Sequence, residues 1–161
     1  MEFLADLHPQ IVHFPVAILI LYSLFEIIGI ALKNEFLLKS AHLLIAIGVV
    51  SSVAAVLTGN QAKEMSYLMK DTFEFYPADL IEEHETFATI LLWYFFAILT
   101  LRTYLVLKKK FKGILQYLFI PLVLIGCFLI YETGDHGGEL VYKYGIGTEI
   151  IKQKKPAETN D

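Results

Sequence analysis

Four apolar stretches, separated by short polar segments, dominate the chain. They run over residues 11–32, 41–57, 87–107 and 114–131. A helix needs about 17–25 predominantly apolar residues to cross the hydrocarbon core of a bilayer, and each stretch falls within or close to that range. The strands of a closed barrel would instead show alternating segments of about ten residues. The pattern therefore predicts an all-α integral membrane protein, an antiparallel bundle of four transmembrane helices.

Composition supports a membrane protein of one domain. Hydrophobic residues make up 56% of the 161 positions, above the 45–50% that is typical of soluble domains. We expect a single domain over residues 1–150 and a disordered tail over residues 151–161. The net charge of -4 argues against nucleic acid as a partner. The apolar composition indicates contact with the lipid bilayer. The single cysteine, Cys127, excludes an internal disulfide and a CxxCH haem attachment.

Charge is distributed unevenly between the two ends of the predicted bundle. The outer segment, residues 60–83, carries six acidic residues and only two lysines, and its first part is predicted as an interfacial helix. Short basic loops stay in the cytoplasm, so both termini and the outer segment are expected on the extracytoplasmic side. Seven basic residues mark the opposite side: Lys33, Lys39, Arg102, Lys108, Lys109, Lys110 and Lys112.

Four of the five histidines gather at the predicted outer end: His8, His13, His84 and His136. Imidazoles that converge at one level of a membrane protein indicate a functional site. His8 and His13 are five residues apart, or about 140° around a helix, so they do not share a face. We expect His13 to point into the bundle and share a site with His84, with His8 and His136 next to it.

Glu26 lies within the first apolar stretch, where a carboxylate needs a partner or a proton. His42 is the nearest candidate in depth, which predicts a hydrogen bond between these two residues, with a proton relay as the alternative. The glycine-rich stretch "ETGDHGGELVYKYGIG", residues 132–147, is predicted as a loop that folds back over the outer mouth of the bundle.

These segments together resemble a bacterial membrane family, domain of unknown function 2231. The matching positions are "HPQIVHFP" at 8–15, Glu26, "TG" at 58–59, His84, and the stretch that begins "GGELVY" at residue 137. The resemblance implies a multi-pass protein of the bacterial cytoplasmic membrane. Related domains are similar in layout to four-helix b-type cytochromes and occur fused to c-type cytochrome or Rieske-like domains, which implies a redox setting and respiratory subunits as partners.

Three functions are compatible with the sequence. The first is an electron-transfer subunit with one haem b on His13 and His84, which exchanges electrons with quinol and an outer acceptor. The second is a copper or zinc site in which Asp135 or Glu85 joins the outer histidines. The third is a membrane anchor or scaffold of a larger complex. In none of them do we expect enzymatic activity of the chain on its own.

Overall fold

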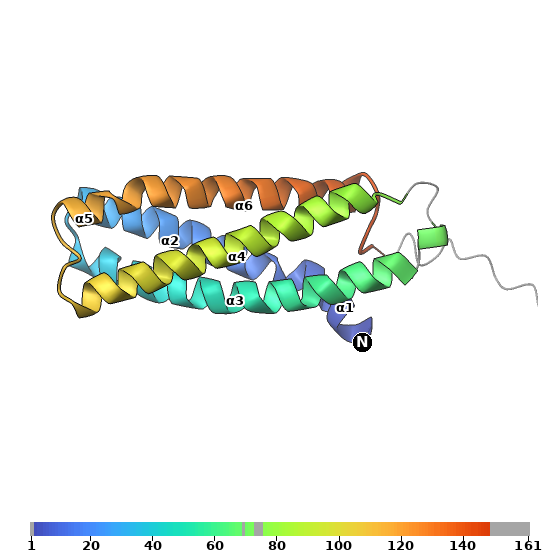
Figure 1. Ribbon diagram of the computed structural model, residues 1–161, viewed down its shortest axis with the longest axis horizontal. Coiled ribbons are helices and arrows are strands. Elements are labelled where there is room, and N and C mark those ends of the chain that lie inside the picture. Colours follow the sequence, from blue (N-terminus) through green and yellow to red (C-terminus); the bar gives the residue numbers. More distant parts are fainter. Residues whose placement is uncertain (1, 69, 73–75, 149–161) are drawn as a thin grey trace, which may run out of the picture.

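The computed structural model describes residues 2–68, 70–72 and 76–148, and the regular elements within these ranges are all helices (Figure 1). The predicted tail at 151–161 lies outside the described residues. Four helical segments are long and apolar enough to cross a membrane, which confirms the predicted all-α architecture. The elements are α1 (Glu2–Ile11), α2 (His13–Ala31), α3 (Glu35–Leu68), η1 (Lys70–Thr72), α4 (Ala78–Leu107), α5 (Ile114–Tyr117) and α6 (Phe119–Tyr142).

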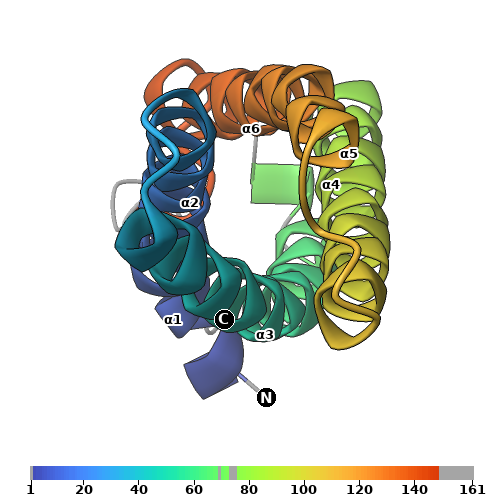
Figure 2. The ribbon, with the colours of Figure 1, turned by 90° about the vertical axis from the view of Figure 1, so that its left-hand side faces the viewer.

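Helices α2, α3, α4 and α6 surround a common core in that order (Figure 2). Each packs on the next and α6 closes the ring against α2, so α2 and α4 face each other diagonally. Helix α1 continues the line of α2 after a turn at Val12 and packs on α3. We call the end that holds α1 the histidine end, and the end that holds residues 32–34 and 108–113 the lysine end.

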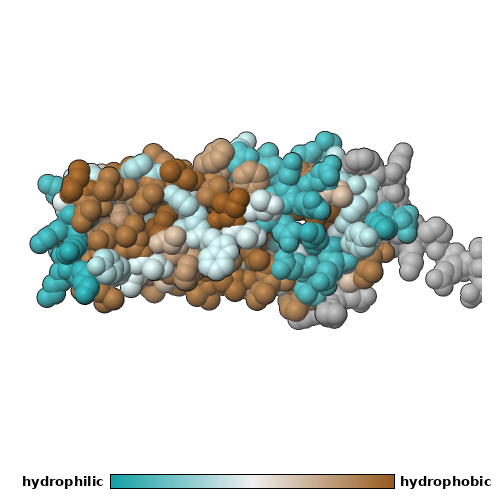
Figure 3. All heavy atoms as spheres, viewed as in Figure 1, coloured by the Kyte–Doolittle hydropathy of each residue, from teal (hydrophilic) through white to brown (hydrophobic). Residues whose placement is uncertain are grey.

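Most of each apolar window faces away from the core. Only 28–39% of the residues in these windows are buried within the protein, and large apolar side chains such as Leu24, Leu101 and Leu124 are exposed. Figure 3 shows this apolar surface in brown along much of the bundle, with polar residues at the lysine end and in a band towards the histidine end. Exposure of so large an apolar surface to water is unfavourable, so this surface is expected to contact lipid.

The helices extend further towards the histidine end than the apolar stretches predicted. Helix α3 continues to Leu68 and α4 begins at Ala78, so residues 60–83 are largely helical. The prediction that residues 132–147 form a loop over the bundle mouth is wrong for most of that stretch, because α6 continues to Tyr142. Positive φ angles occur only at its end, at Gly145 (70°) and Gly147 (80°). Gly147 lies next to Pro9 of α1, so both ends of the bundle sequence meet here.

Candidate functional site

Two imidazoles meet in the interior of the histidine end. His8 comes from α1 and His84 from the second turn of α4, and their ring centres lie 6.5 Å apart with an interplanar angle of 74°. The two residues are partly buried. The bundle therefore brings together imidazoles from its first and third spans, at one depth.

Hydrogen bonds fix the tautomer of both rings. The Nδ1 atom of His84 lies 3.1 Å from the carbonyl oxygen of Thr133, which can only accept, so Nδ1 carries the proton. The Nδ1 atom of His8 lies 3.1 Å from the hydroxyl oxygen of Thr58. That hydroxyl donates its single hydrogen to the carbonyls of Ala54 and Ala55 and accepts from His8. In the neutral form, each ring consequently presents an Nε2 lone pair.

Two glycines make room for these rings. A Cβ atom at Gly59 of α3 would lie 3.0 Å from Cε1 of His8, and a Cβ atom at Gly137 of α6 would lie 3.0 Å from Cε1 of His84. Both distances are shorter than ordinary van der Waals contacts between such atoms. Glycine thus lets the backbones of α3 and α6 pass directly beside the two imidazoles.

A third histidine, His136 of α6, lies close to the pair. Its ring stacks on Phe87 at 5.0 Å between centres, and its Nδ1 donates a 2.6 Å hydrogen bond to the carbonyl of Glu132. Its Nε2 atom lies 3.6 Å from a carboxylate oxygen of Glu83. His136 also interacts electrostatically with His84. His136 therefore lies next to His84, with Glu83 on its Nε2 side.

The other predicted site residues lie elsewhere. His13 begins α2 with an exposed side chain, so the structure brings His8 rather than His13 to His84. The turn at Val12 and the 140° offset between the two residues turn His13 away from the bundle. Glu85 forms an ion pair with Lys63, and Asp135 is exposed beside a shallow hollow on α6. Within the described residues, no group of three or more His, Cys, Asp or Glu side chains is placed to hold a metal ion.

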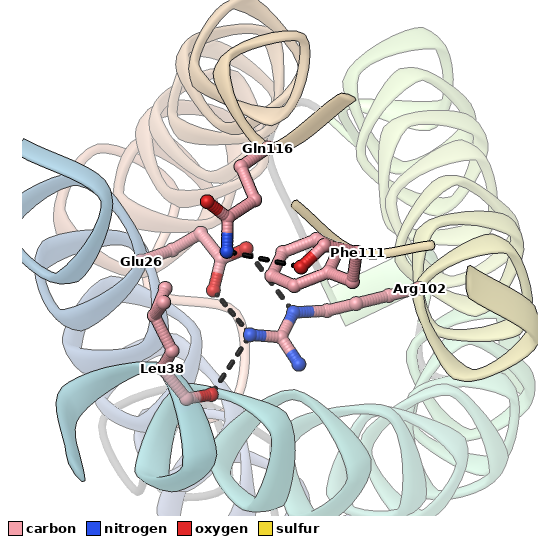
Figure 4. A network of polar contacts seen from close by, with 5 residues as sticks. All are labelled: Glu26, Leu38, Arg102, Phe111 and Gln116. Atoms are coloured by element: carbon pink, nitrogen blue, oxygen red, sulfur yellow. Dashed lines mark hydrogen bonds and ion pairs between the residues drawn. The ribbon is translucent and has the colours of Figure 1, made fainter. Parts of the chain in front are cut away.

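Near the lysine end, a buried ion pair joins the diagonal helices α2 and α4 (Figure 4). The guanidinium of Arg102 donates to both carboxylate oxygens of Glu26, from Nε at 3.1 Å and from Nη2 at 2.8 Å. The side chains are 1% and 0% exposed. Nη2 also donates to the carbonyl of Leu38 at 2.8 Å. Phe111 lies over the guanidinium at 4.5 Å, and its carbonyl accepts from Gln116.

The predicted hydrogen bond between Glu26 and His42 is wrong, because the Glu26 carboxylate accepts from Arg102 instead. The Nδ1 atom of His42 is buried and has no hydrogen-bond partner among the described residues. Sequence reasoning missed Arg102 because it was counted among the basic residues that mark the cytoplasmic side, although it lies within the third apolar stretch. Its position gave a usable signal: five apolar or weakly polar residues separate it from the end of α4, the same depth as Glu26 in α2.

The comparison with protein families covers almost the whole of this structure. Residues 5–150 match the family model described as "Predicted membrane protein (DUF2231)". The chain belongs to this family. Neither the search of curated proteins nor the search of solved structures finds a significant match.

The structure shows where the residues of the DUF2231 motifs lie in this chain. The first histidine of "HPQIVHFP" is His8, which faces His84. The "TG" pair supplies the Thr58 hydroxyl that accepts from His8 and the Gly59 backbone beside its ring. The first glycine of "GGELVY" is Gly137, which makes room for His84. Apart from Glu26, the motifs that carried the family resemblance therefore contribute residues to one pair of imidazoles.

Proposed function

We propose that this DUF2231 chain is a membrane electron-transfer subunit that carries a redox metal between His8 and His84. The separation of the two rings is the observation that carries the proposal. An imidazole nitrogen lies about 2.0–2.1 Å from the metal that it binds and about 1.1 Å from the centre of its own ring, so two rings on opposite sides of one metal have centres about 6.3 Å apart. The observed separation of the ring centres, 6.5 Å, is compatible with one metal between the two rings.

The hydrogen bonds of the two rings also support metal binding. Histidine ligands almost always donate their other ring N–H to a carbonyl, carboxylate or water, which orients the ring and makes the free nitrogen more basic. His84 donates to the carbonyl of Thr133 and His8 to the hydroxyl of Thr58. In both rings Nε2 is therefore unprotonated and available to bind a metal ion.

Haem b is the first candidate for the group between these rings. Bundle cofactors are held by side chains from facing helices, and a pair of axial imidazoles suits a haem that transfers single electrons. The donor would be quinol and the acceptor an extracytoplasmic protein such as a c-type cytochrome or a Rieske-like domain. We expect the histidine end to face outward in the bacterial cytoplasmic membrane, because the loops of the opposite end, residues 32–34 and 108–113, carry five lysines and no acidic residue.

A single copper ion is the second candidate, and close packing favours it. The backbones of α3 and α6 lie directly beside the two imidazoles at Gly59 and Gly137. A porphyrin needs these backbones to move apart, whereas a single ion is far smaller than a porphyrin. Imidazole is a suitable ligand for copper. Zinc fits less well, because its protein sites use three or four side chains, and no such group is formed by the described residues.

The visible spectrum and metal content of the purified protein test the proposal. Haem would give a Soret band and an α-band on reduction; copper would give about one metal ion per chain without these bands. His8→Ala and His84→Ala should each abolish the signal. His13→Ala is the matched control, because its exposed side chain contacts neither ring, and it should retain the signal. A protein without haem or metal would contradict the proposal and favour the scaffold function.

A further inference from the structure

The hydroxyl of Tyr22 in α2 is, besides Nδ1 of His42, a second buried polar group without a hydrogen-bond partner among the described residues. The side chain of Tyr22 is 0% exposed, and its hydroxyl makes no hydrogen bond to any described residue. Its ring packs edge-to-face on Phe95 with 6.1 Å between centres. An unpaired buried hydroxyl is costly, so native proteins rarely leave one without a partner. The position of Tyr22 therefore points to a bound species that the hydroxyl can contact.

The neighbours of Tyr22 show what kind of species this is. Tyr22 lies one turn before Glu26 on α2, and its hydroxyl interacts electrostatically with Glu26 and Arg102. The Glu26 oxygens accept only two of the roughly four hydrogen bonds that a carboxylate can accept. The buried Nδ1 atom of His42 is also unpartnered among the described residues, and His42 interacts electrostatically with Arg102. The region thus holds unused donors and acceptors together.

A species that contacts these groups must be small and able both to donate and to accept hydrogen bonds. Tyr22, Glu26 and Arg102 are at most 1% exposed, so the surrounding helices leave no opening for a larger molecule to reach them from lipid. Buried water in proteins makes about three hydrogen bonds to polar groups of this kind and is costly to remove. A water molecule can accept from the Tyr22 hydroxyl and donate to a carboxylate oxygen of Glu26.

We propose that the bundle holds internal water between Tyr22 and the Glu26–Arg102 pair, and that this water also reaches His42. By helix rise, Tyr22 lies about 14 Å from the lysine end of α2, so a hydrogen-bonded chain extends from that end towards the middle of the membrane. Water is the ligand of this site. A hydrogen-bonded series of water molecules and side chains can transfer protons. The site is independent of the metal proposal, because His8 lies about 21 Å further along the first span.

Hydroxyl-radical footprinting of the full chain in lipid discs tests for the water directly. Bound water produces radicals where it resides, so a buried side chain beside it becomes oxidised even though bulk water does not reach it. Each oxidation rate is divided by that of the same residue in the unfolded chain, because tyrosine is intrinsically more reactive than valine. On this scale we expect oxidation of Tyr22 well above that of Val123, another side chain that is 0% exposed. A normalised rate for Tyr22 equal to that of Val123 would overturn the proposal.

A pair of tyrosine variants tests whether the Tyr22 hydroxyl has a partner. The hydroxyl of Tyr94 donates a 2.7 Å hydrogen bond to the carbonyl of Leu122, so Tyr94→Phe removes a hydrogen bond of known geometry. If water satisfies Tyr22, Tyr22→Phe should lower the melting temperature by at least as much as Tyr94→Phe. If the hydroxyl is unpaired in a dry core, Tyr22→Phe should leave the melting temperature unchanged or raise it, and the proposal fails.

Discussion

Replacing Glu26 by glutamine should destabilise the bundle severely, because it leaves the guanidinium of Arg102 buried beside a neutral partner. The carboxylate accepts two hydrogen bonds from Arg102, and both side chains are almost completely buried. Removing one member of a buried ion pair costs about 3–5 kcal/mol, since the remaining charge has lost its compensation. At about 1.4 kcal/mol for each factor of ten, the folding equilibrium should fall roughly 100- to 4000-fold.

The exposed pair of Glu35 and Lys39 provides a matched control. These side chains are 84% and 80% exposed and four residues apart on α3, so water screens their interaction and Glu35→Gln should change stability little. A double variant, Glu26→Leu with Arg102→Met, removes both buried charges and should recover most of the stability that Glu26→Gln loses, because well-packed apolar residues often replace a buried pair without loss.

The free energy of unfolding in lipid bicelles, measured by steric trapping, tests these expectations. Glu26→Gln and Glu35→Gln should differ by at least the lower bound of the range above. Equal stability of these two variants would refute the reasoning, and so would a double variant that is no more stable than Glu26→Gln alone.

Two further predictions concern the histidine end and the orientation. Gly137→Ala should displace His84 and reduce both stability and metal binding, because its Cβ atom would lie 3.0 Å from the ring. Gly134→Ala is the control, because its Cβ atom would meet nothing within 4 Å. It should raise stability by up to about 1 kcal/mol through helix propensity. Thermal unfolding of the two variants checks this, and equal effects would contradict it. A cysteine introduced at Lys109 should react only with reagents that reach the cytoplasm, and one at Asp6 only with reagents outside; the reverse pattern would overturn the orientation.

The spans were predictable because hydropathy depends on composition alone, whereas the helix ends were not. Helix α6 continues through Gly134, Gly137 and Gly138, residues whose low helix propensity favoured a loop. Tertiary contacts override propensity here: Thr133 accepts from His84 through its carbonyl, and Gly137 packs against the same ring. Neither contact is visible from the local sequence.

The candidate site was predictable in composition but not in its choice of residues. Sequence placed four histidines at one end, yet which of His8 and His13 faces the bundle depends on the helix rotation at Val12. The partner of Glu26 was similarly misjudged, since depth along the chain suggested His42. Counting from the helix ends would have paired Glu26 with Arg102, because α2 and α4 run in the same direction and each charge lies five residues from its end.

Glu26 is synthesised 76 positions before its partner Arg102, so the two charges enter the membrane at different times. A charged residue within a span opposes insertion by up to about 2.5–3.5 kcal/mol, and the apolar remainder of each helix must carry that cost alone. A nascent chain that stops after α3 retains an uncompensated carboxyl group in its first span. Arrival of α4 supplies the guanidinium of Arg102, so the carboxyl group of the first span is compensated only when the third span is complete.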